Sequence, residues 1–193
     1  MIKKSFILVF FLFGFNSLFS QISWETNLKV AQVKAIEKDQ LILVDFWAIW
    51  CGPCKKMDKQ LWERPEMKKL SENFVALKID IDQYPNIARA YNVTSIPRVM
   101  IITASEEVIW EKNGFLMPES YIEILKQIPP SLNGLNKKMV TNAGEENPNS
   151  SFEIGMGFQK LAISTKSDFG MKFINISNSY FKEVEKKLMI LIY

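Results

Sequence analysis

The sequence predicts an α/β protein whose central mixed β-sheet is flanked by helices and followed by a C-terminal helical extension. Short apolar runs that are typical of buried strands alternate with amphipathic stretches that are typical of helices. The C-terminal part of the chain contains helical patterns only. A length of 193 residues suits one domain with an appendage.

The N-terminal segment differs in composition from the rest of the chain. Lys3 and Lys4 precede an apolar run over 6–13, and the small residue Ser20 follows. This order is typical of a secretory signal peptide, so we expect residues 1–20 to be removed and the protein to be exported to the periplasm or another extracytoplasmic space. A retained membrane anchor is the alternative, although the run is shorter than the roughly 20 apolar residues of a span.

Residues 21–130 carry the pattern of the α/β unit. Strands are predicted over the short apolar or alternating runs 41–46, 74–81, 98–103 and 107–112. Helices are predicted over 24–39, from Cys51 to 72 with a break at Pro65, over 84–91 and over 118–128. Gly114 ends the hairpin of the last two strands.

The C-terminal region has two parts. After Pro129–Pro130, residues 131–150 are rich in Asn, Gly, Glu and Pro, a composition that predicts a linker. Residues 151–193 then show helical patterns over 152–165 and 169–192, which predict a helical hairpin. Its apolar residues could pack on the domain or bind a protein partner.

Composition excludes several kinds of chemistry. The chain has no histidine, which excludes Ser–His–Asp and Cys–His catalysis. Two cysteines alone do not complete the usual ligand set of zinc, so no metal is expected. A formal charge of +3 gives no electrostatic footprint for nucleic acid. Cys51 and Cys54 close too small a loop for a structural disulfide, so we interpret them as reactive.

The two cysteines lie in the motif Trp50-Cys51-Gly52-Pro53-Cys54, between a predicted buried strand and a predicted helix. Unpaired amides and the dipole at a helix N-terminus stabilise a thiolate, which is the reactive form of cysteine. A spacing of three places both sulfurs in the first turn, close enough to bridge. We expect Cys51 to attack a substrate disulfide and Cys54 to resolve the mixed disulfide. This redox-active disulfide needs no other cofactor.

The segment 44–55, which contains this motif, resembles the active-site stretch of the thioredoxin family. The likeness extends over roughly 24–128 and includes further matching positions, namely Lys78, Asp82, the run 93–97 and Gly114. The resemblance implies a thioredoxin-like fold, thiol–disulfide oxidoreductase activity and protein disulfides as substrates.

The resemblance also implies roles for individual residues. Asp45 is expected to be a buried carboxylate that moves a proton for Cys54, with Lys78 as its partner. Pro97 is expected to follow a cis peptide bond that places Ile96 beside the sulfurs, its backbone free for an extended substrate. The expected substrate-binding residues are Trp50, Gly52, Pro53, Ile96, Pro97, Arg98 and Gly114.

The sequence leaves structural alternatives to these roles open. Asp45 could be a partly exposed residue at a strand end, Lys78 a surface lysine and Pro97 a trans proline opening an edge strand. Arg98 departs from the family, which commonly has a small or hydroxyl residue there. We hypothesise that this cation favours the Cys51 thiolate or selects acidic substrates.

Three classes of function compete for this sequence. The leading prediction is a reductase of protein disulfides, which in an oxidising compartment needs a membrane-embedded thiol–disulfide electron donor. The same residues could instead serve a disulfide oxidase or isomerase. A non-catalytic protein-binding module on the same scaffold is the second class, and Cu(I) delivery by two thiolates is the third.

Overall fold

The computed structural model describes residues 21–145, 147–165 and 168–192. Residues 1–20, the predicted signal peptide, lie outside the described residues. The sheet has the strand order β1-β3-β2-β4-β5. Its strands are β1 (Trp24–Glu25), β2 (Leu41–Trp47), β3 (Phe74–Asp80), β4 (Arg98–Ile102) and β5 (Val108–Asn113). The pairs β1–β3 and β2–β3 are parallel, whereas β2–β4 and β4–β5 are antiparallel, which confirms the predicted mixed sheet.

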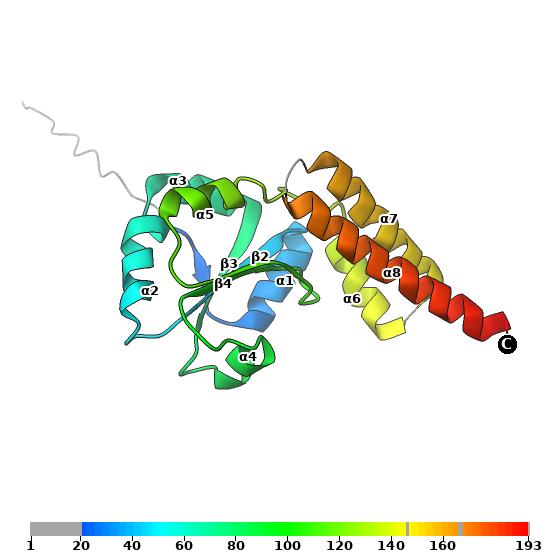
Figure 1. Ribbon diagram of the computed structural model, residues 1–193, viewed down its shortest axis with the longest axis horizontal. Coiled ribbons are helices and arrows are strands. Elements are labelled where there is room, and N and C mark those ends of the chain that lie inside the picture. The colour runs from blue at the N-terminus through cyan, green and yellow to red at the C-terminus, as the bar shows by residue number, and fades with distance from the viewer. Residues whose placement is uncertain (1–20, 146, 166–167, 193) are drawn as a thin grey trace, which may run out of the picture.

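Helices cover both faces of this sheet and extend beyond one end of it (Figure 1). The helices of the α/β unit are α1 (Leu28–Lys38), α2 (Gly52–Met57), the π-helical turn η1 (Asp58–Trp62), α3 (Pro65–Leu70), the 3₁₀ turn η2 (Ser71–Asn73), α4 (Pro85–Ala90) and α5 (Pro118–Leu125). The C-terminal helices are α6 (Leu135–Glu145), α7 (Pro148–Ser164) and α8 (Asp168–Ile192). No described helix is both long enough and apolar enough to cross a membrane.

The alternation of side chains along β2 separates two hydrophobic cores. Leu41 and Leu43 belong to the core shared with α3, α5 and η1, whereas Ile42 and Val44 belong to the core shared with α1. Successive strand residues point to opposite faces, so Asp45 lies on the same face as Leu43. This register directs the carboxyl group of Asp45 toward the helical run that begins at the cysteine motif.

That helical run continues from α2 into η1 without a break. Cys51 is the N-cap of α2, and Pro53 lies in its first turn, where its missing N–H costs nothing. The N–H of Glu63 donates to the carbonyl of Asp58 at 2.9 Å, a five-residue bond that marks the wider π turn. Pro65 then starts α3 as a separate helix, as the sequence predicts.

The N-terminal helix is shorter than the sequence predicts. Residues Trp24–Glu25 form β1, which pairs with β3, and α1 begins only at Leu28. The side chain of Asn27 caps α1 by accepting a hydrogen bond from the N–H of Val30 at 3.2 Å. A strand of two residues is too short to show the alternation of apolar and polar side chains that identifies strands. The apolar pattern therefore placed the start of the helix at residue 24, too early in the chain.

The predicted linker over 131–150 is wrong where α6 forms. Polar residues usually indicate an exposed segment, but two asparagines of α6 are buried and hydrogen-bonded. Asn136 is fully buried and donates to the carbonyls of Ala35 and Gln40, at 3.0 and 2.7 Å. Leu135 and Met139 are buried on the same helix, so tertiary contacts override the local composition.

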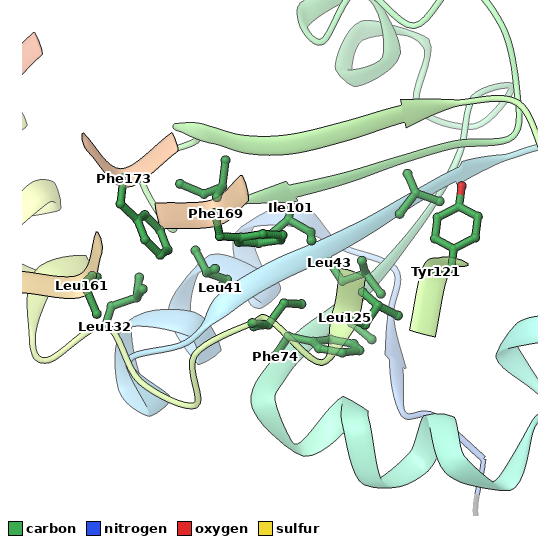
Figure 2. Packing of buried hydrophobic residues seen from close by; sticks show 14 of the residues in the cluster. Leu41, Leu43, Phe74, Ile101, Tyr121, Leu125, Leu132, Leu161, Phe169 and Phe173 are labelled. Atoms are coloured by element: carbon green, nitrogen blue, oxygen red, sulfur yellow. The ribbon is translucent and has the colours of Figure 1, made fainter. Parts of the chain in front are cut away.

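The predicted helical hairpin over 151–193 is present as α7 and α8, and it packs on the end of the sheet. Figure 2 shows Phe169 and Phe173 of α8 lying against Leu41 of β2 and Ile101 of β4, and all four belong to one buried cluster. Ser177 of α8 is also buried, and its hydroxyl donates to the carbonyl of Gly155 at 2.8 Å. The C-terminal helices therefore share their core with the α/β unit.

Candidate functional site

Cys51 and Cys54 form a disulfide at the N-terminus of α2, with an S–S distance of 2.03 Å. The sulfur of Cys51 accepts a hydrogen bond from the N–H of Cys54 at 3.1 Å. Both residues are almost fully buried in this oxidised state, in a cluster with Ala48. A sulfur that accepts a helix N-terminal amide is placed to be stabilised as a thiolate once the bond is reduced.

A backbone segment from a different part of the chain lies beside the disulfide. The peptide bond between Ile96 and Pro97 is cis, and Ile96 packs against the cluster that contains both cysteines. The carbonyl of Pro97 accepts from the N–H of Gly114 at 2.8 Å. Gly114 has φ of 77°, a left-handed conformation that favours glycine. The cis bond expected before Pro97 is present and Ile96 lies beside the cysteines, whereas the expected substrate contacts of Ile96, Pro97 and Gly114 stay predictions.

The surface around the disulfide exposes one large aromatic ring. Trp50 is 64% exposed, yet its indole N–H donates to Oδ2 of Asp82 at 2.8 Å, which holds the ring in place. Gly52 and Pro53 are exposed next to it. A fixed, half-apolar ring beside a reactive sulfur can contact a protein substrate at low entropic cost.

Asp45 is buried, with 1% of its surface exposed, which excludes the alternative of a partly exposed strand-end residue. Its Oδ2 atom lies 3.4 Å from the ammonium nitrogen of Lys78 and accepts a hydrogen bond from the indole of Trp62 at 3.2 Å. Its Oδ1 atom has no hydrogen-bond partner among the described residues. One carboxylate oxygen is thus held by two donors while the other stays unpaired.

Lys78 connects Asp45 to a second carboxylate. Its ammonium group pairs with Asp58 of η1 and lies over the rings of Trp24 and Trp47, at 5.3 and 5.1 Å. Lys78 is therefore a partner of Asp45, as the resemblance implies, and is shared with a second acid.

Burial dominates the acidity of Asp45. Removal from water raises the pKa of the Asp45 carboxyl from 3.8 to about 6, although the positive charge of Lys78 opposes this change. The charge of Asp58 raises the pKa further, whereas the hydrogen bonds from Lys78 and Trp62 lower it. A carboxyl group with a pKa near 6 can accept and release a proton close to neutral pH.

Arg98 lies on the opposite face of the sheet from Asp45. It begins β4, and its guanidinium donates to the carbonyl of Asn92 at 2.9 Å and to Oε2 of Glu111 at 2.6 Å. Its side chain is 9% exposed. These contacts hold the segment that leads into Pro97, and the predicted effect of Arg98 on the Cys51 thiolate or on substrate charge stays a prediction.

Sequence reasoning missed Trp62, which touches the candidate proton carrier directly. A signal was available, because Cys54, Asp58 and Trp62 are spaced by four residues and so follow one face of a continuous helix.

The described residues hold no group of three or more His, Cys, Asp or Glu side chains that could bind a metal ion.

Known proteins with similar sequences share the region that contains this site. The sequence model of the thioredoxin family matches residues 25–127. The chain is 34% identical over 89 residues to a thioredoxin of Chlorobaculum thiosulfatiphilum, which covers 44% of this chain and 77% of that protein. It is 40% identical over 74 residues to a thioredoxin of Rickettsia felis, covering 38% of this chain and 69% of that protein.

A solved structure agrees with the fold. The solution structure of a thioredoxin from Thermus thermophilus superimposes with a TM-score of 0.50 at 19% identity, covering 55% of this chain and 86% of that chain. The family match ends before α6, so the C-terminal helices lie outside it.

Proposed function

The chain belongs to the thioredoxin family, and on that premise we propose that it reduces protein disulfides outside the cytoplasm through Cys51 and Cys54. The activity class, thiol–disulfide oxidoreductase, follows from the family and from the disulfide of the motif. The observation that carries the proposed mechanism is the convergence of this disulfide and the buried carboxyl of Asp45 on one helical run.

The first half of the proposed cycle forms a mixed disulfide. The thiolate of Cys51, stabilised by the N–H of Cys54, attacks one sulfur of the substrate disulfide. The substrate S–S bond breaks, its second sulfur leaves as a thiolate and takes a proton, and Cys51 is now bonded to the substrate. The backbone of Ile96 and the ring of Trp50 are the proposed substrate contacts.

The second half resolves the mixed disulfide. Asp45 accepts the proton of the Cys54 thiol, and the resulting thiolate attacks the sulfur of Cys51. The bond between Cys51 and the substrate breaks, and the substrate leaves as its second thiol after taking a proton. Two electrons have passed to the substrate, and the disulfide between Cys51 and Cys54 is restored without any other cofactor.

The direction of this cycle is part of the proposal. Gly-Pro between the cysteines resembles the reducing members of the family, and a raised Asp45 pKa suits resolution toward a reduced product. A reductase in an oxidising space must be recharged by a dithiol, and we propose a membrane-embedded thiol–disulfide relay as the donor.

Trapping of the mixed disulfide tests the two sulfur roles. Reduced Cys54→Ser should form a long-lived adduct with a disulfide-bonded protein, because nothing resolves the bond on Cys51. Cys51→Ser should form none under the same conditions. An adduct that accumulates on Cys54 in the Cys51→Ser variant would reverse the assignment.

Export is proposed from the sequence pattern of residues 1–20. Mass spectrometry of the protein recovered from a periplasmic fraction should find an N-terminus close to Gln21. Recovery of the unprocessed chain in the cytoplasm would contradict the proposed location.

A protein partner for the C-terminal helices is proposed because α8 exposes consecutive apolar side chains. Leu188, Met189 and Ile190 are 48, 59 and 68% exposed. A photo-crosslinking residue at position 189 should yield a discrete adduct with another protein in cells, whereas the same residue at the exposed position 137 should not. Identical labelling at both positions would argue against a specific partner.

A further inference from the structure

The strand and the helix on either side of the motif meet at a single carboxyl group. β2 carries Asp45, and the helical run that starts at Cys51 carries Trp62 at its far end. The bond from the Trp62 indole to Oδ2 of Asp45, 3.2 Å long, joins these two elements directly. It connects the element that supplies the sulfurs to the proposed proton carrier.

The indole ring of Trp62 is fixed by its neighbours. Trp62 is 3% exposed and meets Trp24 edge to face, with ring centroids 5.4 Å apart, and Tyr121 of α5 with centroids 6.0 Å apart. On its outer side the ring lines a surface pocket together with Lys78 and Asp58. The ring therefore cannot rotate without disturbing the packing of the core.

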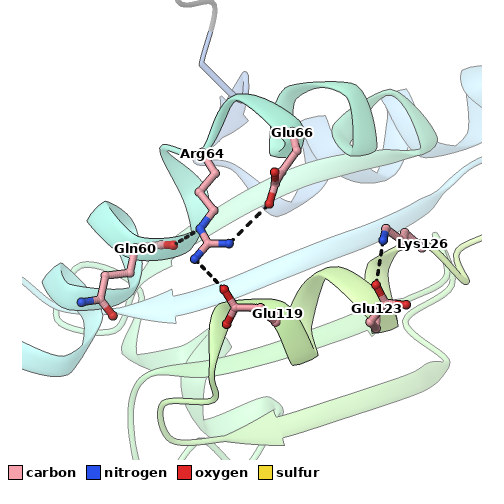
Figure 3. A network of polar contacts seen from close by, with 6 residues as sticks. All are labelled: Gln60, Arg64, Glu66, Glu119, Glu123 and Lys126. Atoms are coloured by element: carbon pink, nitrogen blue, oxygen red, sulfur yellow. Dashed lines mark hydrogen bonds and ion pairs between the residues drawn. The ribbon is translucent and has the colours of Figure 1, made fainter.

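The backbone that carries Trp62 is also tied down. Arg64, directly after the π turn, donates to the carbonyl of Gln60 at 2.6 Å and to Glu119 of α5 at 2.9 Å (Figure 3). Tyr121, which packs on Trp62, comes from the same helix as Glu119. Helix α5 therefore contacts both the backbone segment that follows Trp62, through Glu119, and the Trp62 ring itself, through Tyr121.

The consequence for Asp45 is an asymmetric carboxyl group. Trp62 and Lys78 both approach Oδ2, whereas Oδ1 has no partner among the described residues. We propose that Trp62 is a positioning residue of the thiol–disulfide cycle: its indole holds Oδ2 of Asp45 and so presents Oδ1 as the atom that takes the proton of Cys54. This inference rests on the proposed role of Asp45 as the base.

The charged and titratable groups around Asp45 set the expected direction of change. Lys78 faces it from β3, Asp58 from η1 and the hydroxyl of Tyr121 from α5, and this hydroxyl has no hydrogen-bond partner in the described part of the chain. A donor to a carboxylate favours its charged form, so the Trp62 hydrogen bond lowers the pKa of Asp45. Loss of the indole N–H should raise that pKa above its value of about 6.

The test compares Trp62→Phe with the wild type and with Trp110→Phe. Trp110 also packs on Tyr121, at 6.1 Å between centroids, which makes it a matched aromatic control. The readout is the rate at which a preformed mixed disulfide on Cys51 is resolved, measured from pH 5 to 9. In Trp62→Phe the midpoint should rise by about one pH unit, so that the rate at pH 6 falls about fivefold. Trp110→Phe should keep the wild-type midpoint.

A second measurement tests the hydrogen bond in the wild-type protein, without a substitution that changes the packing around Trp62. In the wild-type oxidised protein, the indole N–H resonance of Trp62 should titrate with a midpoint near 6, following the charge of Asp45. The titration should disappear in Asp45→Asn. A Trp62 resonance that is unchanged across this range would overturn the inference even if Trp62→Phe did not fold.

Failure of the inference and failure of the proposed base can be told apart. If Asp45→Asn leaves the pH profile of resolution unchanged, Asp45 is not the base and the inference falls with it. If Asp45→Asn abolishes the profile while Trp62→Phe keeps the wild-type midpoint, the base assignment stands and Trp62 has a packing role only.

Discussion

At the scale of single residues, Asp45 is maintained in an environment that opposes its charge. Burial raises its pKa to about 6, and neither Lys78 nor Trp62 fully offsets the loss of water. Such a group costs folding free energy when it is ionised, so its presence in a core is better explained by proton transfer than by stability.

The cost can be measured through Asp45→Asn in the oxidised protein. The folded pKa lies above the unfolded one, so the native state holds the proton more tightly and the free energy of unfolding falls as pH rises from about 4 to 6. Asparagine resembles the protonated acid, so the variant should be more stable than wild type by about 3 kcal/mol at pH 7. Urea unfolding at pH 7 and pH 4 checks this, and the gain should vanish at pH 4. A variant less stable than wild type at pH 7 would contradict the account.

How much of the site the sequence could reveal also depends on single residues. The motif alone predicts that Cys51 and Cys54 are the reactive pair, because two cysteines three residues apart at a helix N-terminus can form a redox-active disulfide without any distant residue. The family resemblance then supplied Asp45, Lys78 and Pro97. The helical spacing places Trp62 on the same face as Cys54, but its hydrogen bond to Asp45 follows from the packing of η1 against β2, which no sequence pattern shows.

At the scale of elements, α6 shows how a polar segment becomes structural. Asn136 satisfies three backbone groups at once, since Ala104 also donates to its side chain at 3.0 Å. Asp39, at the end of α1, accepts hydrogen bonds from Ser131 and from the N–H of Gly134, both at 2.7 Å. Composition predicts a linker here because it cannot show that these polar groups find partners between 32 and 101 residues away along the chain.

Asn136→Leu should reveal this role of α6. The substitution leaves at least the Ala104 N–H and the Gln40 carbonyl buried without a partner, so the free energy of unfolding should fall by about 3 kcal/mol. Lys137→Ala, at an exposed position of the same helix, is the control and should change little. Equal small effects from both substitutions would mean that α6 is only loosely attached.

At the scale of the whole molecule, the C-terminal helices complete the core of the thioredoxin unit. Phe169 and Phe173 lie in the same buried cluster as Leu41 and Ile101 of the sheet (Figure 2). Phe158 of α7 belongs to that cluster as well. The cysteine motif and the C-terminal helices lie at opposite ends of β2. The motif follows shortly after the C-terminal end of this strand, and α8 packs on its first residue, Leu41. The sequence predicted the hairpin from its periodicity, but periodicity does not say which surface the hairpin covers.

Removal of residues 131–193 should therefore destabilise the α/β unit. Uncovering several large apolar side chains, each contributing roughly 1.5–3 kcal/mol when buried, should lower the free energy of unfolding by at least about 3 kcal/mol. Full-length protein should unfold in one transition by both tryptophan fluorescence and circular dichroism. A truncated chain of unchanged stability, or two separate transitions, would show that the helices form an independent unit.

The direction of electron flow is the central claim that remains to be measured. The reduction potential of the Cys51–Cys54 pair can be determined on the chain from Gln21 onward by equilibration with glutathione redox buffers. A reductase predicts a potential well below that of the glutathione couple, so that the dithiol form donates electrons to substrates. A potential well above that couple would mean that the protein oxidises its substrates, and the proposed direction would be wrong.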